Sequence, residues 1–224
     1  MHRALIVVGK APVAGKTKTR LVPPLSHEDA AALSTAFLID TLSTALSLGW
    51  ERTTLVHPRG QASLLQGLVD PQVHLLEQPK DGLADALAYA FEQHFAAGFT
   101  YVTLIGSDNP TLPAETIRAA AAALESGADL AIGPTVDGGY YLIGMRRQHL
   151  GVFDGIDWST PRVFMQTLER ASQLGLRVHR VREWYDVDEV QDVERLEREL
   201  ASSPRGVAPR TRAVLELSRT ARAD

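Results

Sequence analysis

The chain has 224 residues, a length that favours one large domain over two small ones. Lysine and arginine number 23 against 27 for aspartate and glutamate, a formal charge of −4, and the lack of a long basic tract argues against a dedicated nucleic-acid binder. The absence of cysteine excludes disulfides, thiolate metal sites and thiol nucleophiles. We find neither a signal-peptide core nor an uninterrupted apolar run of about 18 residues, and therefore expect a cytoplasmic protein without membrane insertion.

Seven apolar runs bounded by Gly, Pro or Asp predict β-strands, at 4–8, 53–57, 73–76, 101–105, 130–132, 140–143 and 177–181. Helical patterns lie between most of these runs. One begins after Ser26, which forms a capping box with Asp29, and the others span 82–97, 113–126 and 161–174. This alternation predicts an α/β fold with a mostly parallel sheet covered by helices. Ligands are then expected at the carboxyl ends of the strands.

The composition changes near residue 200. We predict one domain over 1–200 and a C-terminal tail over 201–224, where Pro204, Gly206 and Pro209 precede a few apolar residues among charges. A short terminal helix or a frayed end is expected in this tail.

The first candidate site is the loop that follows the first strand. Four cations lie within eleven residues of this loop: Lys10, Lys16, Lys18 and Arg20. A P-loop has four residues between its first glycine and its Gly-Lys, whereas five separate Gly9 from Gly15, and the prolines at 23 and 24 end any helix early. We therefore predict a cradle for a di- or triphosphate that is not a P-loop, with a solvated loop as the alternative.

The second candidate is a carboxylate at the end of the most apolar strand. Asp108 follows the run at 101–105 and can hold Mg²⁺ or Mn²⁺ against nucleotide phosphates, because hard cations prefer oxygen ligands. Alternatively, Asp108 caps the turn before Pro113, which starts the next helix. The spacing alone leaves both interpretations open.

Two further segments carry carboxylates. Asp137 precedes Gly138 and Gly139, which admit a close approach to the backbone, although an Asp-Gly turn is also a hairpin signal and the residues alone favour the hairpin. Asp186 and Asp188 share one face if the chain is extended there, but Asp188 with Gln191 also predicts a helix cap. We expect both segments to converge on the cavity of Asp108, since loops at the carboxyl ends of strands gather in one crevice.

Two common kinds of site are not predicted. The seven histidines form no pair at helical spacing, so a zinc site is not indicated. Gly106-Ser107 lacks the second glycine of a nucleophile elbow, which argues against serine hydrolase chemistry.

Together these segments resemble a bacterial family of glycosyltransferase-like proteins of the GT-A nucleotide-diphospho-sugar transferase fold, described as associated with radical-SAM and selenium-related domains. The match runs from the first strand to about Leu200. It rests on ordered motifs at 10–21, 105–110, 133–144, 153–160 and 186–188.

The resemblance implies a three-layer α/β/α fold, a nucleotide held by the first loop and a divalent cation, Mg²⁺ or Mn²⁺, at Asp108. One stretch departs from the family pattern. After the third strand the family usually reads Gly-Asp-Leu-Gly-Glu-Arg, whereas this chain reads Asp-Gly-Leu-Ala-Asp-Ala at 81–86 and lacks the arginine. That version looks more like the related 2-phospholactate guanylyltransferases.

The sequence therefore predicts a metal-dependent transferase with a nucleoside-diphosphate-activated donor, with glycosyl transfer from a nucleotide sugar favoured. The alternatives are a nucleotidyltransferase of the 2-phospholactate guanylyltransferase type and a non-catalytic nucleotide-binding module. The expected partners are a nucleotide or nucleotide sugar and a small-molecule acceptor, with no nucleic acid, and a homodimer is compatible with the sequence.

Each role is assigned to named residues. The nucleotide is expected at Lys10, Gly15, Lys16, Lys18, Arg20 and Gly82, and the acceptor at Gly138, Gly139, Tyr140 and Trp158. The metal is expected at Asp108, with Asp186 or Asp188 completing its shell or holding the loop that does. Asp137 is expected to orient or deprotonate an acceptor hydroxyl, and Asp108 to act in catalysis through the metal.

Overall fold

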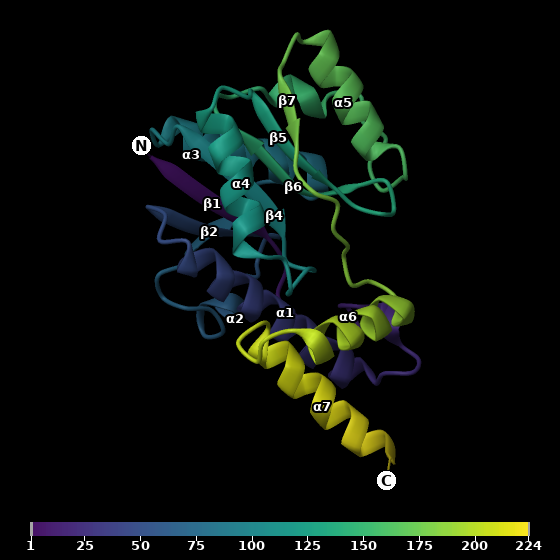
Figure 1. The fold of residues 1–224 in the computed structure, drawn as a ribbon. Helices are drawn as coiled ribbons and strands as arrows, with labels where there is room; N and C mark the ends of the chain where they lie inside the picture. Colours follow the sequence, from purple (N-terminus) through teal and green to yellow (C-terminus); the bar gives the residue numbers. More distant parts are fainter. Residues whose placement is uncertain (1, 224) are drawn as a thin grey trace.

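The computed structural model describes residues 2–223 and contains a seven-stranded sheet in the order β3-β2-β1-β4-β6-β5-β7 (Figure 1). The strands are β1 (Arg3–Val8), β2 (Arg52–His57), β3 (His74–Glu77), β4 (Tyr101–Gly106), β5 (Leu130–Pro134), β6 (Tyr140–Met145) and β7 (Val178–Arg180). All seven predicted strands are present, and their ends differ from the prediction by no more than two residues. Local apolar patterning was therefore sufficient to find them.

The pairing of the strands gives a mixed sheet that is mostly parallel, as expected. β1 pairs in parallel with β2 and with β4, and β2 pairs in parallel with β3. β6 is antiparallel to both of its neighbours, β4 and β5, because β5 and β6 form a hairpin. The carboxyl ends of β1, β2 and β4 consequently lie at one edge of the sheet, where ligands bind in folds of this kind.

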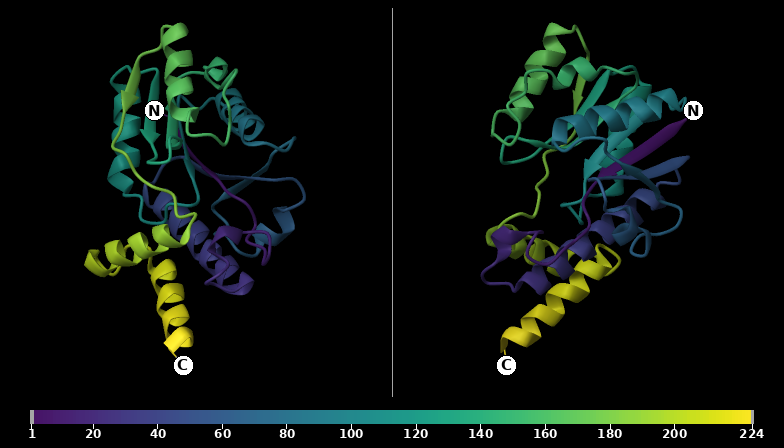
Figure 2. Two further views of the ribbon diagram at one scale, coloured as in Figure 1. Left: turned by 90° about the vertical axis from the view of Figure 1, so that its right-hand side faces the viewer. Right: turned by 180° about the vertical axis from the view of Figure 1, so that it is seen from behind.

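Helices cover both faces of the sheet and make three layers (Figure 2). The helices are α1 (His27–Ser47), α2 (Ala62–Gln66), α3 (Leu83–Ala96), α4 (Ala114–Glu125), α5 (Val163–Gln173), α6 (Val190–Ser202) and α7 (Pro209–Ala223), with 3₁₀ turns η1 (Thr19–Leu21) and η2 (Leu150–Phe153). Successive residues of β1 face opposite layers: Leu5 and Val7 pack with α1, α2 and α4, and Ile6 packs with α3, η2 and α5. Each of these buried side chains contributes about 1.5–3 kcal/mol.

Helix α1 is buried on two sides, which explains its apolar composition. Leu38 and Leu42 pack on the sheet, whereas Leu33 and Phe37 join a separate cluster with α6 and α7. Helix α1 is long and apolar enough to cross a membrane by length and composition alone. However, 56% of its apolar 18-residue stretch is buried inside the protein, as in the core helix of a globular protein. Its start is as predicted, since the Ser26 hydroxyl accepts a hydrogen bond from the backbone N–H of Asp29 at 3.0 Å.

The C-terminal segment forms a helix, the first of the two alternatives expected for it, and this helix packs on α1. The carboxylate of Asp40, 3% exposed, accepts hydrogen bonds from the backbone N–H groups of Arg210 at 3.2 Å and Thr211 at 2.8 Å. Asp40 thus caps the N-terminus of α7, and Leu215 is buried in the α1, α6 and α7 cluster. The predicted boundary at residue 200 lies inside α6.

A long extended connection joins β7 to α6 and runs along the molecule from the sheet to the helical end (Figure 1). Its last residues meet the end of β4, where Val187 N–H donates to the backbone oxygen of Asp108 at 2.9 Å. Glu189 caps α6 in a capping box with Asp192, so the predicted cap formed by Asp188 with Gln191 is wrong. The cap lies one residue later because the Asp188 side chain is paired with Lys18 instead.

Candidate functional site

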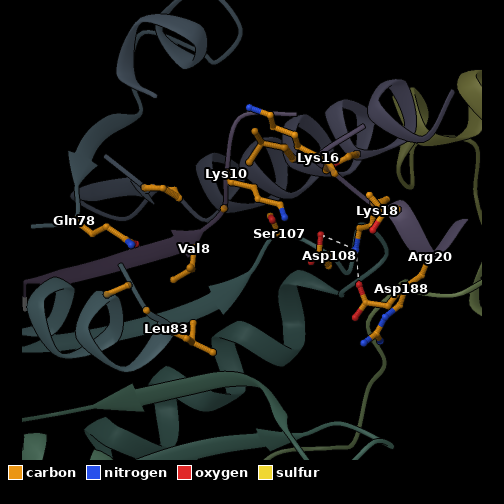
Figure 3. A pocket seen from close by; sticks show the side chains of 18 residues that line it. Val8, Lys10, Lys16, Lys18, Arg20, Gln78, Leu83, Ser107, Asp108 and Asp188 are labelled. Carbon is orange, nitrogen blue, oxygen red and sulfur yellow. Dashed lines mark hydrogen bonds and ion pairs between the residues drawn. The ribbon is translucent and has the colours of Figure 1, made fainter. Parts of the chain in front are cut away.

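A cavity of about 660 Å³ opens at the carboxyl ends of β1 and β4 and at the start of α3. Figure 3 shows its two ends: Gln78 and Leu83 lie at one, and Lys18, Arg20, Asp108 and Asp188 lie at the other. Lys10, Lys16 and Ser107 line the region between them. The cavity is therefore polar and charged at one end and partly apolar at the other.

The charged end is built around Lys18, which the sequence assigned to phosphate. Its Nζ lies 3.0 Å from Oδ1 of Asp108 and 2.7 Å from Oδ1 of Asp188 (Figure 3). The Lys18 side chain is 5% exposed, whereas those of Asp108 and Asp188 are 42% and 47% exposed. Burial lowers the pKa of Lys18, but the two carboxylates outweigh it and the pKa is raised above its usual value of 10.5. Lys18 is therefore a stable cation in contact with two accessible carboxylates.

The Asp108 carboxylate accepts no hydrogen bond from a backbone N–H in the described part of the chain, so the structure does not support the alternative that it caps the turn before Pro113. The N-cap of α4 is Pro113, and no side chain caps this helix. The Asp108 carboxylate is instead the partner of Lys18. Two segments that are distant in the sequence, 108 and 186–188, thus meet at one edge of the sheet, as predicted.

The basic loop differs from a P-loop, in agreement with the sequence. Lys18 has a left-handed backbone, φ 50°, and is followed by the single turn η1 instead of a long helix. Lys10 and Lys16 line the cavity together with Arg20. Gly15 is exposed, has φ +77° and does not belong to the cavity lining, so its role in the structure is a backbone turn.

Two residues at the end opposite Lys18 were not singled out from the sequence, namely Gln78 and Leu83. Gln78 follows β3 directly and is 7% exposed. Gly82, which was predicted for the nucleotide, lines the cavity beside them and is the N-cap of α3 with φ 116°. The signal for Gln78 was present in the sequence, since a polar residue directly after a predicted strand lies at the ligand-binding edge.

A second cavity of about 300 Å³ adjoins the charged end and shares Arg20 and Asp188 with the first. Asp137 and Asp186 line it. The predicted convergence of Asp137 and Asp186 near Asp108 is therefore present, although Asp137 lines only this second cavity of the two.

Asp186 is held by a residue that sequence reasoning missed. The side-chain amide Nδ2 of Asn109 donates to Oδ1 of Asp186, while Oδ1 of Asn109 is buried without a partner in the described structure. Burial, followed by the charges of Asp108 and Asp188, raises the pKa of Asp186 to about 7. Asp186 is thus partly protonated near neutral pH.

The hairpin interpretation of residues 137–139 is confirmed. Oδ1 of Asp137 accepts hydrogen bonds from the Thr135 hydroxyl at 2.5 Å and from the Gly139 N–H at 3.2 Å. These bonds close the turn between β5 and β6. They occupy one carboxylate oxygen of Asp137.

The residues predicted for the acceptor do not line either cavity. A Cβ on Gly138, whose φ is +90°, would lie 2.1 Å from the backbone oxygen of Pro161, so the close approach at this glycine is made by the chain itself. Tyr140 and Trp158 are packed edge to face, with ring centroids 6.4 Å apart. Trp158 also contacts the ring of Phe153 in η2.

The donor set limits which metal site these residues can form. No group of three or more His, Asp or Glu side chains in the described part of the chain is arranged to hold a metal ion, so a shell of three carboxylates from Asp108, Asp186 and Asp188 is not present. Asp108 and Asp188 form a pair of accessible carboxylates. Such a pair suits Mg²⁺ or Mn²⁺ when water and phosphate oxygens supply the other ligands.

Comparison with known families and curated proteins gives one match. The profile of a bacterial family described as "Uncharacterized protein conserved in bacteria (DUF2064)" matches residues 41–160. Comparison with curated proteins finds no match.

Solved structures share the fold over nearly the whole chain. A protein of Desulfovibrio desulfuricans G20, assigned as a nucleotide-diphospho-sugar transferase, is 32% identical with a TM-score of 0.90, and the match covers 98% of this chain and 96% of that one. Rv0371c of Mycobacterium tuberculosis H37Rv, in complex with manganese, is 18% identical with a TM-score of 0.52 and coverage of 91% and 100%. A CMP:2-keto-3-deoxy-manno-octonic acid synthetase in complex with CTP is 11% identical with a TM-score of 0.56 and coverage of 90% and 99%. These matches show the fold of the nucleotide-diphospho-sugar transferases.

Proposed function

The chain belongs to the bacterial DUF2064 family, and from its site geometry we propose that it is a metal-dependent transferase whose donor is activated by a nucleoside diphosphate. Glycosyl transfer from a nucleotide sugar is the favoured reaction. The relative from Desulfovibrio desulfuricans G20, assigned as a nucleotide-diphospho-sugar transferase, supports this class.

One observation carries the proposal. The cavity of about 660 Å³ combines a carboxylate pair, Asp108 and Asp188, with cations of the basic loop at the carboxyl end of the parallel strands. A cavity of this size is in the range of small-molecule and nucleotide sites. Its two unlike ends match a nucleotide, which has a flat base at one end and phosphates at the other.

At the charged end the protein's task is to neutralise a departing diphosphate. Arg20 lines this end of the cavity, with its Nη1 3.7 Å from Oε1 of Glu189. Lys10 and Lys16 line the neighbouring middle region and form no ion pair in the described part of the chain. A divalent cation held by Asp108 and Asp188 would supply further positive charge at the phosphates. Charge stabilisation of this kind usually dominates group transfer from phosphate leaving groups.

The acceptor would occupy the adjoining cavity of about 300 Å³. Oδ1 of Asp137 is engaged in its own turn, but Oδ2 has no partner in the described structure and can accept the proton of an acceptor hydroxyl. Asp137→Asn is then expected to lower turnover by about 100-fold or more without changing nucleotide affinity.

Nucleotidyl transfer is the second candidate, and the segment at 81–86 favours it, since it lacks the family's usual arginine. Here the donor would be a nucleoside triphosphate. The two reactions release different products, because glycosyl transfer frees a nucleoside diphosphate and nucleotidyl transfer frees pyrophosphate.

Calorimetric titration with nucleotide sugars and nucleoside triphosphates, with and without Mn²⁺, tests the proposal. We expect Mn²⁺ to strengthen binding to the native protein, and Asp108→Asn to remove that response while the protein stays folded. Asp154→Asn is the matched control, because Asp154 is 73% exposed and lies outside both cavities. Nucleotide binding that ignores Mn²⁺, without turnover of any donor, would instead indicate a non-catalytic binding module.

A further inference from the structure

The ammonium group of Lys18 is surrounded by acceptors of the protein itself in this structure. Its ammonium group carries three N–H bonds, and three acceptors surround it: Oδ1 of Asp108 at 3.0 Å, Oδ1 of Asp188 at 2.7 Å and the backbone oxygen of Val187 at 2.7 Å. The side chain is 5% exposed and Nζ lies 5.8 Å from the centre of the Phe37 ring. Lys18 is therefore held by the protein itself.

The same carboxylates are reached from two sides. Lys18 approaches them from the protein interior, whereas the carboxylates of Asp108 and Asp188 are 42% and 47% exposed and line the cavity. A divalent cation that enters the cavity therefore meets the same two carboxylates whose Oδ1 atoms bind the ammonium. Two cations cannot share these oxygens at close range without strong repulsion.

We propose that Lys18 is an internal counter-ion of the Asp108 and Asp188 pair, and that a divalent cation exchanges with it. The cation carries twice the charge of the ammonium and takes the two oxygens, and Lys18 then turns away from the carboxylates. On the proposed function, the released ammonium donates to a phosphate of the bound nucleotide, so the metal and the nucleotide bind cooperatively. Without the metal, Lys18 stays with the carboxylates.

Titration with Mn²⁺ alone tests the exchange independently of any nucleotide. Lys18→Met is expected to bind Mn²⁺ at least ten-fold more tightly than the native protein, because the internal competitor is gone. Lys16→Met is the matched control: it loses the same charge from the same loop, but Lys16 is exposed and forms no ion pair in the described structure, so we expect a change below three-fold. If Lys18 instead organises the carboxylates for the metal, Lys18→Met binds Mn²⁺ more weakly and the proposal is overturned.

A measurement on the native protein keeps the test valid if Lys18→Met does not fold. With ¹⁵N-labelled lysine, a hydrogen-bonded ammonium gives a slowly exchanging ¹⁵N–¹H signal, which the Lys18→Arg variant assigns by its loss. Saturation with Mg²⁺ is expected to abolish this signal. Its persistence when the protein is saturated with Mg²⁺ would overturn the exchange, as would the absence of any Mg²⁺ or Mn²⁺ binding.

The exchange and the proposed function fail in different ways. If Mn²⁺ displaces Lys18 but no nucleotide or nucleotide sugar binds the loaded protein, the exchange stands and the transferase proposal fails. If nucleotides bind with Mn²⁺ while Lys18 keeps its carboxylates, the transferase proposal stands and the exchange is overturned.

Discussion

Asp108 and Asp188, at the charged end of the cavity, differ from Asp137, in the turn between β5 and β6, in what holds their carboxylates. The first two bind the ammonium of Lys18, and in the described part of the chain their side chains cap no turn or helix end. Asp137 closes its own turn through Thr135 and Gly139. Asp108 follows β4 and Asp137 lies between β5 and β6, whereas Asp188 lies in the connection between β7 and α6. The sequence alone left a structural interpretation open for each of them.

This difference shows how a structural carboxylate is distinguished from one that is available for a ligand. Asp137 accepts hydrogen bonds from groups of its own turn, and this structural role is sufficient to account for the residue. A charged side chain whose partner is another charged side chain has no such local structural role. Buried or half-buried ion pairs are often replaceable by apolar residues without loss of stability. The Lys18, Asp108 and Asp188 cluster is therefore the better indication of function, and the hairpin is first of all structure.

The largest expected effect concerns the hairpin. Gly138→Ala should lower the free energy of unfolding by about 3 kcal/mol or more, because its Cβ would lie 2.1 Å from the Pro161 oxygen at a φ of +90°. Chemical denaturation measures this change.

Gly15→Ala is the matched control, since Gly15 also has positive φ, +77°, but apart from its chain neighbours no atom of the described residues lies within 4 Å of the added Cβ. Its cost should be about 1 kcal/mol, the strain of a left-handed alanine alone. Equal effects of the two substitutions would mean that the hairpin tip is not packed on Pro161 and is free to admit an acceptor.

The next effect is a pH dependence of stability at Asp186, in the cavity that adjoins the charged end. Asp186 has its pKa raised to about 7, so the folded protein binds this proton more tightly than the unfolded chain does. Its contribution to stability is complete below the unfolded pKa near 4 and is lost as the pH rises towards about 7. Asp186→Asn, which keeps the oxygen that accepts from Asn109, should therefore gain stability relative to the native protein by about 2 kcal/mol between pH 4 and pH 7.

Denaturation curves of both proteins at pH 4, 5.5 and 7 check this prediction. The expected gain in stability is smaller than the roughly 4 kcal/mol that corresponds to a full shift of about three pKa units, because Asp186 is only partly buried and solvent screens its charge. A stability difference between the two proteins that does not vary with pH would show that the pKa of Asp186 is not raised. Asp186 would then be a structural carboxylate, as Asp137 is.

The smallest expected effect is on the stability of the hairpin, and it tests most directly whether the hairpin and the nucleotide cavity are independent. Thr135→Val removes the hydroxyl that donates to Asp137 and should cost about 1–2 kcal/mol, because the bond is made to a charged group. Thr100→Val, at an exposed position, should change stability by less than about 0.5 kcal/mol. Nucleotide affinity should be the same in both variants. A loss of affinity in Thr135→Val alone would show that the hairpin contributes to nucleotide binding.

Much of the fold was accessible from the sequence. The seven strands, the helices α1, α3, α4 and α5, and the Ser26 cap were predicted because alternation, helical spacing and capping are properties of neighbouring residues. The location of Asp108 at the ligand-binding edge followed in the same way from the strand before it. The cap of α6 was predicted one residue early, because Asp is a preferred capping residue, whereas the Asp188 side chain pairs with Lys18 and Glu189 forms the cap.

The sequence by itself determined which polar residues lie at the carboxyl edge of the sheet, because a strand's direction fixes where the next residue goes. The tertiary structure decided what those residues bind. Lys18 and Asp188 are 170 residues apart, and Asp40 and Thr211 are 171 apart, so neither pair has a local pattern. Their partners were settled only when α1, β4 and the connection to α6 packed together, because an ion pair or a cap depends on distances between segments that the order of residues does not contain.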